Sequence, residues 1–340
     1  RGRLQGISTH GVEEYINAKN DEECYRFVLP GAGRLEWTQG RKTVTSGGPE
    51  GTIVSITSCY EHRIVDGVHV LLEEVDRSGT VQVAIAAKGR ELPPFVDIAV
   101  LQTLQFLTAR PLYFSVAARK GVHQRVLRLT GPVAKAGMSA LPPPLHVESH
   151  VEVKAYWEVF DALLLYLLRA ELNPFYHKLI EHYLAIMDAS IRHPASYPLV
   201  LAVTIEAVLP SCRSSSQDDL TQTPKPESLD GLKQYLGEWK GGDPAWHADA
   251  AIIRRLEGFI DGSMRRWSAN DRLRKLESKG VITRAQRRAW EAIRHRTAHG
   301  LPGGSAADIM HVLTMFYRIV FDEIGYRGQA TDWAAHGSSG

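Results

Sequence analysis

The feature that most constrains the fold of this chain is a change of hydrophobic periodicity near its middle. Up to Leu129, apolar residues form short runs separated by Gly-, Asp- and Ser-containing pieces, which is typical of β-strands joined by turns. After Pro142-Pro143-Pro144 they recur every three to four residues, which is typical of amphipathic helices. We therefore predict an α+β fold, with a β-rich module over residues 1–145 followed by a helical domain over 146–336.

The N-terminal module is expected to form a sheet or a small sandwich. Its candidate strands lie at 25–29, 52–56, 68–72 and 81–86, with a further extended piece at 122–129. A helix is predicted over 97–110, because apolar residues recur there at helical intervals and Pro111 follows. This module contains no metal, phosphate-loop or nucleophile motif, so we interpret it as a recognition or regulatory unit.

The C-terminal domain is expected to be an antiparallel helical bundle. Its predicted helices lie at 153–172, 175–191, 199–209, 246–267, 283–299 and 305–324. Ser196 is expected to cap the third of these helices. A capping box is expected at Thr283-Arg284-Ala285-Gln286, and Ser305 with Asp308 three residues later is expected to start the last helix.

Composition narrows the class of protein. At 340 residues, the length favours two domains, and 44% apolar with 23% charged residues is ordinary for a globular protein. No apolar run reaches the ~18 residues of a membrane span, and no apolar segment follows Arg1 and Arg3 as in a secretory signal. The cysteines Cys24, Cys59 and Cys212 have neither disulfide nor zinc spacing. These features predict a cytoplasmic protein without a bound metal.

The net charge of +2 conceals a strongly basic segment. From Arg254 to Arg296 there are 13 Lys and Arg against 5 Asp and Glu, a local charge of +8. Such a segment is expected at a polyanion site, and Arg265, Arg266, Arg287 and Arg288 are candidate RNA contacts. A solvated helix face would give the same count.

The candidate catalytic cluster closes the helix predicted at 283–299. Arg294, His295, Arg296 and His299 lie within six consecutive residues, directly before Gly300. Histidine transfers protons near neutral pH, and arginine can bind two phosphate oxygens through its planar fork. Cationic residues in a last helical turn also favour the helix dipole, so a purely structural role as a helix cap remains an alternative.

The bare Arg-to-His pattern is not specific, because Arg63 and His69 also match its looser spacing. In Arg294-His295-Arg296-Thr297-Ala298-His299, a polar residue follows the first arginine, and the histidine comes after four intervening residues. This pattern on a bundle helix resembles the signature of the HEPN superfamily (higher eukaryotes and prokaryotes nucleotide-binding). The residue after the arginine is most often Asn in that superfamily, and here it is His295.

Two other stretches extend the resemblance over about 196–333. Leu201-Ala202-Val203-Thr204-Ile205-Glu206-Ala207-Val208-Leu209 resembles the first HEPN helix, where a Glu recurs in an apolar setting. Gly325-Tyr326-Arg327-Gly328, followed by Asp332-Trp333, resembles the ending of the Apea-like HEPN branch. We expect Glu206 to pair with a bundle arginine, and Tyr326 and Trp333 to pack in the core.

The resemblance implies a metal-independent endoribonuclease without cofactor, acting in anti-phage defence or abortive infection. His299 would take the proton of the RNA 2′-hydroxyl, Arg294 would clamp the phosphate, His295 would orient the phosphate or transfer a proton, and Glu206 and Arg296 would support them. It also implies a homodimer with a composite site, and a phage-derived trigger sensed by the N-terminal module. The alternative is a non-catalytic HEPN module that binds RNA or protein.

Overall fold

The computed structural model describes residues 24–30, 32, 35, 37, 39–47, 53–74, 79–120, 125–129, 141–170, 177–211, 268–328 and 330–336. The predicted helix at 246–267, Arg265, Arg266 and Cys212 lie outside the described residues. An antiparallel sheet is followed along the chain by a helical part, which confirms the predicted α+β class.

The sheet has seven strands in the order β2-β3-β4-β5-β1-β6-β7, and each neighbouring pair is antiparallel. The strands are β1 (Cys24–Leu29), β2 (Gln39–Gly47), β3 (Ile53–Val65), β4 (Val68–Glu74), β5 (Val81–Ala87), β6 (Val116–Lys120) and β7 (Arg125–Leu129). β2 and β6 were not predicted, because their sequences carry few large apolar residues. Pairing with neighbouring strands, which no local pattern encodes, places them in the sheet.

β3 is far longer than the strand predicted at 52–56. Polar residues such as Glu61 and Arg63 interrupt the apolar pattern, although the strand continues through them to Val65. The β3–β4 turn has Asp66 at φ 49° and Gly67 at φ 72°, both in the left-handed region. An Asp-Gly pair with two positive φ angles is the signature of a tight type I′ hairpin, so this turn fixes the register between β3 and β4.

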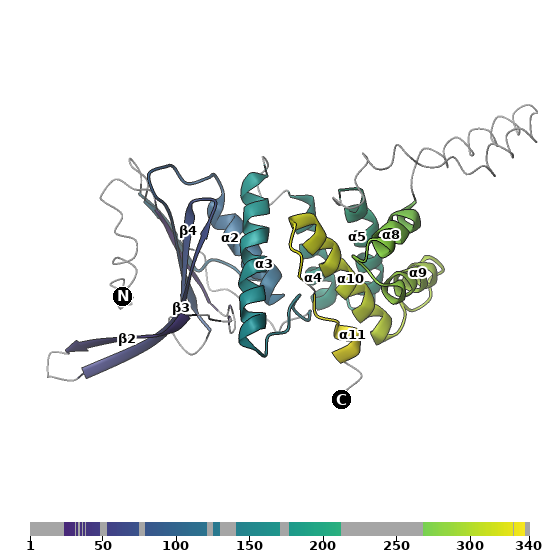
Figure 1. The fold of residues 1–340 in the computed structure, drawn as a ribbon, viewed down its shortest axis with the longest axis horizontal. Helices are drawn as coiled ribbons and strands as arrows, with labels where there is room; N and C mark the ends of the chain where they lie inside the picture. The colour runs from purple at the N-terminus through teal and green to yellow at the C-terminus, as the bar shows by residue number, and fades with distance from the viewer. Residues whose placement is uncertain are drawn as a thin grey trace, which may run out of the picture.

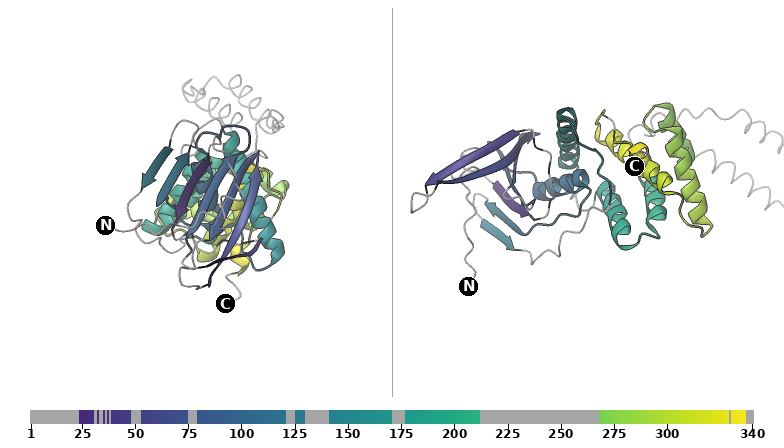
Figure 2. Two further views of the ribbon diagram at one scale, coloured as in Figure 1. Left: turned by 90° about the vertical axis from the view of Figure 1, so that its left-hand side faces the viewer. Right: turned by 90° about the horizontal axis from the view of Figure 1, so that it is seen from below.

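The helices form layers against one face of the sheet, as Figures 1 and 2 show. They are α2 (Val96–Thr108), α3 (His150–Arg169), α4 (Lys178–Arg192), α5 (Tyr197–Val208), α8 (Ala269–Ser278), α9 (Arg284–Ala298), α10 (Ala306–Ile324) and the short α11 (Trp333–His336), with the 3-10 turn η2 (Leu209–Ser211) after α5. α2 and α3 lie next to the sheet, and α4, α5, α8, α9 and α10 lie beyond them. One continuous apolar core runs from β1 to the segment after α10.

Two helix starts agree with the sequence and two do not. The capping boxes at Thr283 and Ser305 are formed as predicted. Ser196 caps nothing: its hydroxyl donates to the carbonyl of His193 at 3.1 Å, and its backbone is already helical. α8 was not predicted, because Leu273 and Leu276 are its only buried residues and give too weak a periodicity.

α2 joins the sheet layer to the bundle. The ring of Phe106 on α2 packs edge-on against Tyr183, Tyr317 and Phe321 of the helical part. The Tyr183 hydroxyl also donates to the Phe106 carbonyl at 3.3 Å. The two parts of the chain therefore share one packed core.

Candidate functional site

The end of α9 positions the Arg-His cluster through a regular C-terminal cap. The N–H of Leu301 donates to the carbonyl of Arg296 at 2.9 Å, and the N–H of Gly300 donates to that of Thr297 at 3.1 Å. This pair of bonds is a Schellman motif, which needs a left-handed residue after the cap, and Gly300 supplies it at φ 69°. His299 is the C-cap residue, so its exposed side chain lies at the C-terminal end of α9.

The structure brings the two histidines of the cluster together. The rings of His295 and His299 lie edge to face, with centroids 4.6 Å apart and an interplanar angle of 66°. Both side chains are exposed to solvent. Two imidazoles in contact at an open surface can take and give a proton on the same bound group, which is the requirement of general acid–base chemistry.

Arg294 lies on the side of α9 that faces α5. Its Nε donates to Oε1 of Glu206, so the expected ion pair of Glu206 with a bundle arginine is formed. The guanidinium also lies over the ring of Trp290, 6.0 Å from its centroid. The Arg294 side chain remains 53% exposed, so it is held in place and still meets solvent.

Trp290 is a positioning residue that the sequence analysis did not single out. It is buried, and its Nε1 donates to the carbonyl of Ala202 on α5 at 3.1 Å. This bond ties α9 to α5 one turn before Arg294. The sequence signal for this contact is a tryptophan four residues, or about one helical turn, before the arginine of the motif.

Arg296 acts within the loop that follows α9. Its Nε donates to the carbonyl of Pro302 at 2.9 Å. The same loop touches the start of α5, because a Cβ on Gly303 would collide with the ring of Pro198. Arg296 and Gly303 therefore hold the end of α9 in register with α5.

Arg294 and His299 do not meet within one chain. No hydrogen bond joins them in the part of the chain that the structure describes, and they contact different residues, Glu206 for Arg294 and His295 for His299. Residues five apart on an α-helix are rotated by about 140°, which accounts for the separation. A site that uses both groups on one phosphate needs a further contribution.

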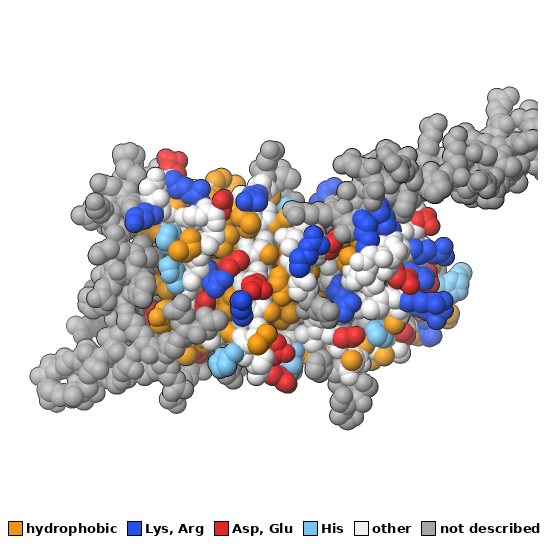
Figure 3. Space-filling model, in the orientation of Figure 1, with side chains coloured by type: hydrophobic (Ala, Val, Ile, Leu, Met, Phe, Trp, Pro, Cys, Tyr) orange, Lys and Arg blue, Asp and Glu red, His pale blue; other side chains and the backbone are white. Residues whose placement is uncertain are grey.

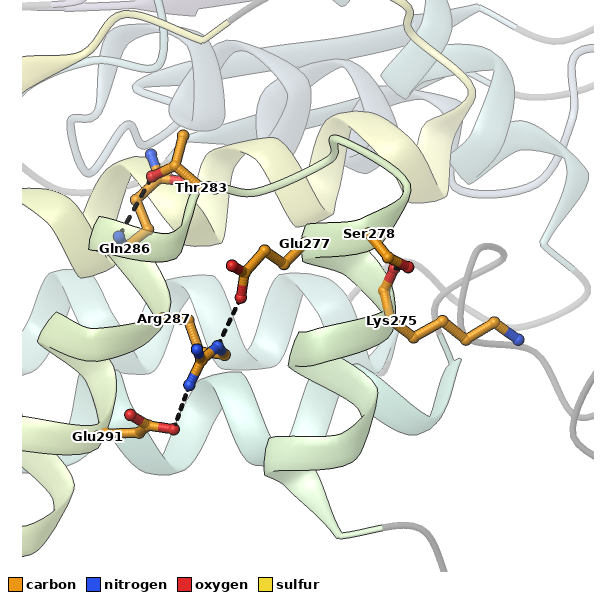
Figure 4. Close-up of polar contacts among 7 residues, drawn as sticks. All are labelled: Lys275, Glu277, Ser278, Thr283, Gln286, Arg287 and Glu291. Atoms are coloured by element: carbon orange, nitrogen blue, oxygen red, sulfur yellow. Dashed lines mark hydrogen bonds and ion pairs between the residues drawn. The ribbon is translucent and has the colours of Figure 1, made fainter. Parts of the chain in front are cut away.

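Of the candidate RNA contacts, Arg287 is already engaged (Figure 4). Its Nε donates to Glu277 at 2.6 Å and another of its nitrogens donates to Glu291 at 2.5 Å, and the side chain is only 12% exposed. The hydrogen bond to Glu277 is the main cause that raises the pKa of Arg287. Arg288, by contrast, is exposed on α9.

An apolar stripe on α5 adjoins the Arg294–Glu206 pair. We define the α5 stripe as Leu199, Val203 and Ala207, which recur every four residues and are exposed. Leu199 is 42% and Val203 52% exposed, although both are large apolar side chains. Exposed apolar side chains at helical spacing often mark a surface that another molecule covers.

The surroundings of the cluster are basic. Figure 3 shows Lys and Arg side chains gathered over α8 and α9.

Among the described residues, no group of three or more His, Cys, Asp or Glu could hold a metal ion. Nor does any described helix have the length and apolar character to cross a membrane. Comparisons with protein-family models, with curated proteins and with solved structures find no match.

Proposed function

We propose that this protein is a metal-independent endoribonuclease of HEPN type, with Arg294, His295 and His299 as its catalytic residues. The observation that carries the proposal is an arginine held by Glu206, close along α9 to an exposed pair of histidines in mutual contact. In the described part of the chain, the carboxylate of Glu206 accepts a hydrogen bond from Nε of Arg294 alone. The two terminal amino groups remain free to bind two phosphate oxygens.

The proposed reaction uses the 2′-hydroxyl of RNA as its nucleophile. One histidine, His299, takes the 2′-hydroxyl proton as the oxygen attacks the adjacent phosphorus. Arg294 neutralises the charge that gathers on the phosphorane, and His295 gives a proton to the departing 5′-oxygen. The products are a 2′,3′-cyclic phosphate and a 5′-hydroxyl. Exposed basic residues such as Arg288 hold the RNA strand.

A homodimer completes the site in this proposal. The α5 stripe becomes the interface of a two-fold dimer, which brings Arg294 of one protomer next to His299 of the other. This arrangement overcomes the rotation that separates the two residues on α9. We further propose that the protein acts in anti-phage defence. A trigger bound to the sheet would activate the bundle.

The chemistry is tested with purified protein and RNA in excess EDTA. We expect cleavage to persist, to give 2′,3′-cyclic phosphate ends, and to disappear in His299→Ala. Loss of cleavage in EDTA, or 3′-hydroxyl ends, would contradict the mechanism. RNA binding with a strong salt dependence but no cleavage would instead favour the non-catalytic alternative.

The shared site is tested by mixing two inactive variants. A dimer of one Arg294→Ala protomer and one His299→Ala protomer contains one complete site and one doubly defective site. After dissociation and reassociation, half of the dimers are mixed, so about a quarter of wild-type activity returns. Absence of recovery while mixed dimers form would show that Arg294 and His299 do not act across the interface.

The role in defence is tested in a bacterial host that carries wild type or His299→Ala. We expect equal growth without infection, and growth arrest of the wild-type host alone after phage challenge. Equal survival of both hosts under challenge by a broad phage panel would contradict the defence role.

A further inference from the structure

The five arginines of α9 differ in whether the fold already uses them. Arg287 bonds to two carboxylates, Arg294 to a third, and Arg296 to a backbone carbonyl. Arg284 and Arg288 are exposed, and neither forms a hydrogen bond or an ion pair in the part of the chain that the structure describes. These two guanidinium groups are therefore available to a ligand.

Arg284 and Arg288 lie on the face of α9 that also carries the two histidines. At about 3.6 residues per turn, four side chains fall within about 60° around the helix axis: Arg284, Arg288, His295 and His299. All four are exposed, and so is Ala292, which lies between Arg288 and the histidines. We define these five residues as the α9 track.

The spacing along the α9 track suits one strand of a nucleic acid. Arg284 and Arg288 are four residues apart, which is about 6 Å along the helix axis and close to the spacing of neighbouring phosphates in an extended strand. Arg288 comes seven residues, or about 10 Å, before His295. A strand that has one phosphate at the histidines therefore has other phosphates within reach of both arginines.

The carboxylates beside the α9 track are bonded to another arginine. Glu291 is the only carboxylate of α9, and it accepts a hydrogen bond from Arg287 at 2.5 Å. Arg287 also donates to Glu277 of α8 at 2.6 Å (Figure 4). Both carboxylates thus bond to Arg287, and neither pairs with Arg284 or Arg288 in the described part of the chain.

We infer that the α9 track binds single-stranded RNA, with one strand running along α9 from the histidines to Arg284. The position of the strand rests on the proposed function, because the histidines mark the phosphate that is cleaved. The attacking 2′-oxygen must lie in line with the departing 5′-oxygen, and an A-form duplex holds its backbone away from this alignment. A single strand can adopt it over His295 and His299, while Arg288 and Arg284 bind further phosphates.

The test is fluorescence anisotropy of the full chain with a short labelled oligouridine in which every 2′-hydroxyl is methylated. This probe keeps its phosphates but cannot undergo 2′-hydroxyl attack, so binding is measured apart from cleavage. We expect the single strand to bind at least about tenfold more tightly than the same strand paired with its complement. Arg284→Gln and Arg288→Gln should each lower the slope of log K against log salt by about 0.7, the contribution of one phosphate contact.

The matched control is Arg274→Gln, an exposed arginine on α8 outside the α9 track. It removes the same charge and should leave the slope unchanged, because an exposed charge acts weakly at a distance. Arg288→Lys keeps the charge and should retain the wild-type slope, which separates the charge from a role in packing. Ala292→Glu places a carboxylate in the middle of the track and should weaken binding of the single strand. Circular dichroism checks that each variant is folded.

Four results would each overturn the inference. They are absence of binding, equal binding of the single and the paired strand, unchanged slopes in both Arg284→Gln and Arg288→Gln, and an equal loss of slope in Arg274→Gln. If the wild type cleaves ordinary RNA while one of these results is found, the proposed function stands without the track. If the expected slopes are found but ordinary RNA is not cleaved, the track stands and the proposed cleavage is contradicted.

Discussion

Two stretches of this chain place an arginine a few residues before a histidine, and the tertiary structure gives the two arginines different surroundings. Arg63 and His69 lie on facing strands of the β3–β4 hairpin. Arg294 and His299 lie at the end of α9. The two stretches look alike in sequence, so the comparison shows how packing alone changes the contacts of an arginine.

The difference lies in the carboxylates that each arginine meets. Arg63 forms a two-point ion pair with Asp161 on α3 and a further bond of 3.3 Å to Glu61, whose side chain is fully buried. Arg294 meets Glu206 through one nitrogen. The side chain of Arg63 is 25% exposed and that of Arg294 is 53% exposed. An arginine saturated by carboxylates joins two layers of a fold, whereas one held at a single nitrogen can still bind a phosphate.

The largest expected contrast is catalytic. His299→Ala should lower the RNA cleavage rate by about 10²–10⁴, the usual contribution of a general base, while the matched change His69→Ala leaves it unchanged. Both rates are measured with the same labelled RNA under single-turnover conditions. Equal losses in the two variants would mean that the two patterns do not differ in function.

The next effect concerns the surface beside Arg294. Val203→Asp places a charge in the α5 stripe and should weaken the proposed dimer by about 2 kcal/mol, about thirtyfold in its dissociation constant. Cleavage should fall in parallel, because the composite site is lost. Val151→Asp, at an exposed valine on α3, is the control and should leave both unchanged. Light scattering measures the assembly, and a dimer unaffected by Val203→Asp would place the interface elsewhere.

A third contrast is in stability. Arg63→Ala removes the cation that bonds Asp161 at two points and Glu61 at one. It should destabilise the fold by about 2 kcal/mol, less than loss of a fully buried pair, because Arg63 and Asp161 keep some exposure. Arg294→Ala should cost no more than about 0.5 kcal/mol, as at other surface positions. Urea unfolding of both variants gives the comparison. The reverse order would show that Arg294 contributes more than Arg63 to the free energy of unfolding.

The smallest effect is a pH dependence at the hairpin. Burial lowers the pKa of His62 below 6.5, with a further lowering by His69 and by Arg63 and an opposing effect of Glu61. Below pH 6.5 the unfolded chain therefore binds this proton more readily than the folded one, so stability falls as the pH falls below 6.5. His62→Asn should flatten this slope in unfolding curves taken between pH 7.5 and 5. An unchanged slope would rule out His62 as its source.

The local features of the fold were largely predictable from the sequence. Strands β1, β4 and β5, the long helices and the capping boxes of α9 and α10 all follow from patterns within a few neighbouring residues. Predictions failed where local patterns were weak, as in β2, β6 and α8. The prediction that Ser196 caps α5 was wrong, because the preceding turn starts the helix and the Ser196 side chain makes no cap hydrogen bond.

The contacts among the residues of the candidate site were predictable only in part. A histidine pair four residues apart on a helix can be expected to touch, and His295 and His299 do. The burial of Arg287 between Glu277 and Glu291 could not be expected, because it depends on how α8 packs against α9.

The sequence by itself determined where helices and strands form, how α9 ends at Gly300, and which residue types gather there. Hydrogen bonds and caps act over three or four residues, so these features are written locally. Only the tertiary structure decided that Glu206 meets Arg294 across 88 residues and that Asp161 pairs with Arg63. The physical reason is that an arginine pairs with whichever carboxylate packing brings within reach, and packing is a property of the whole chain.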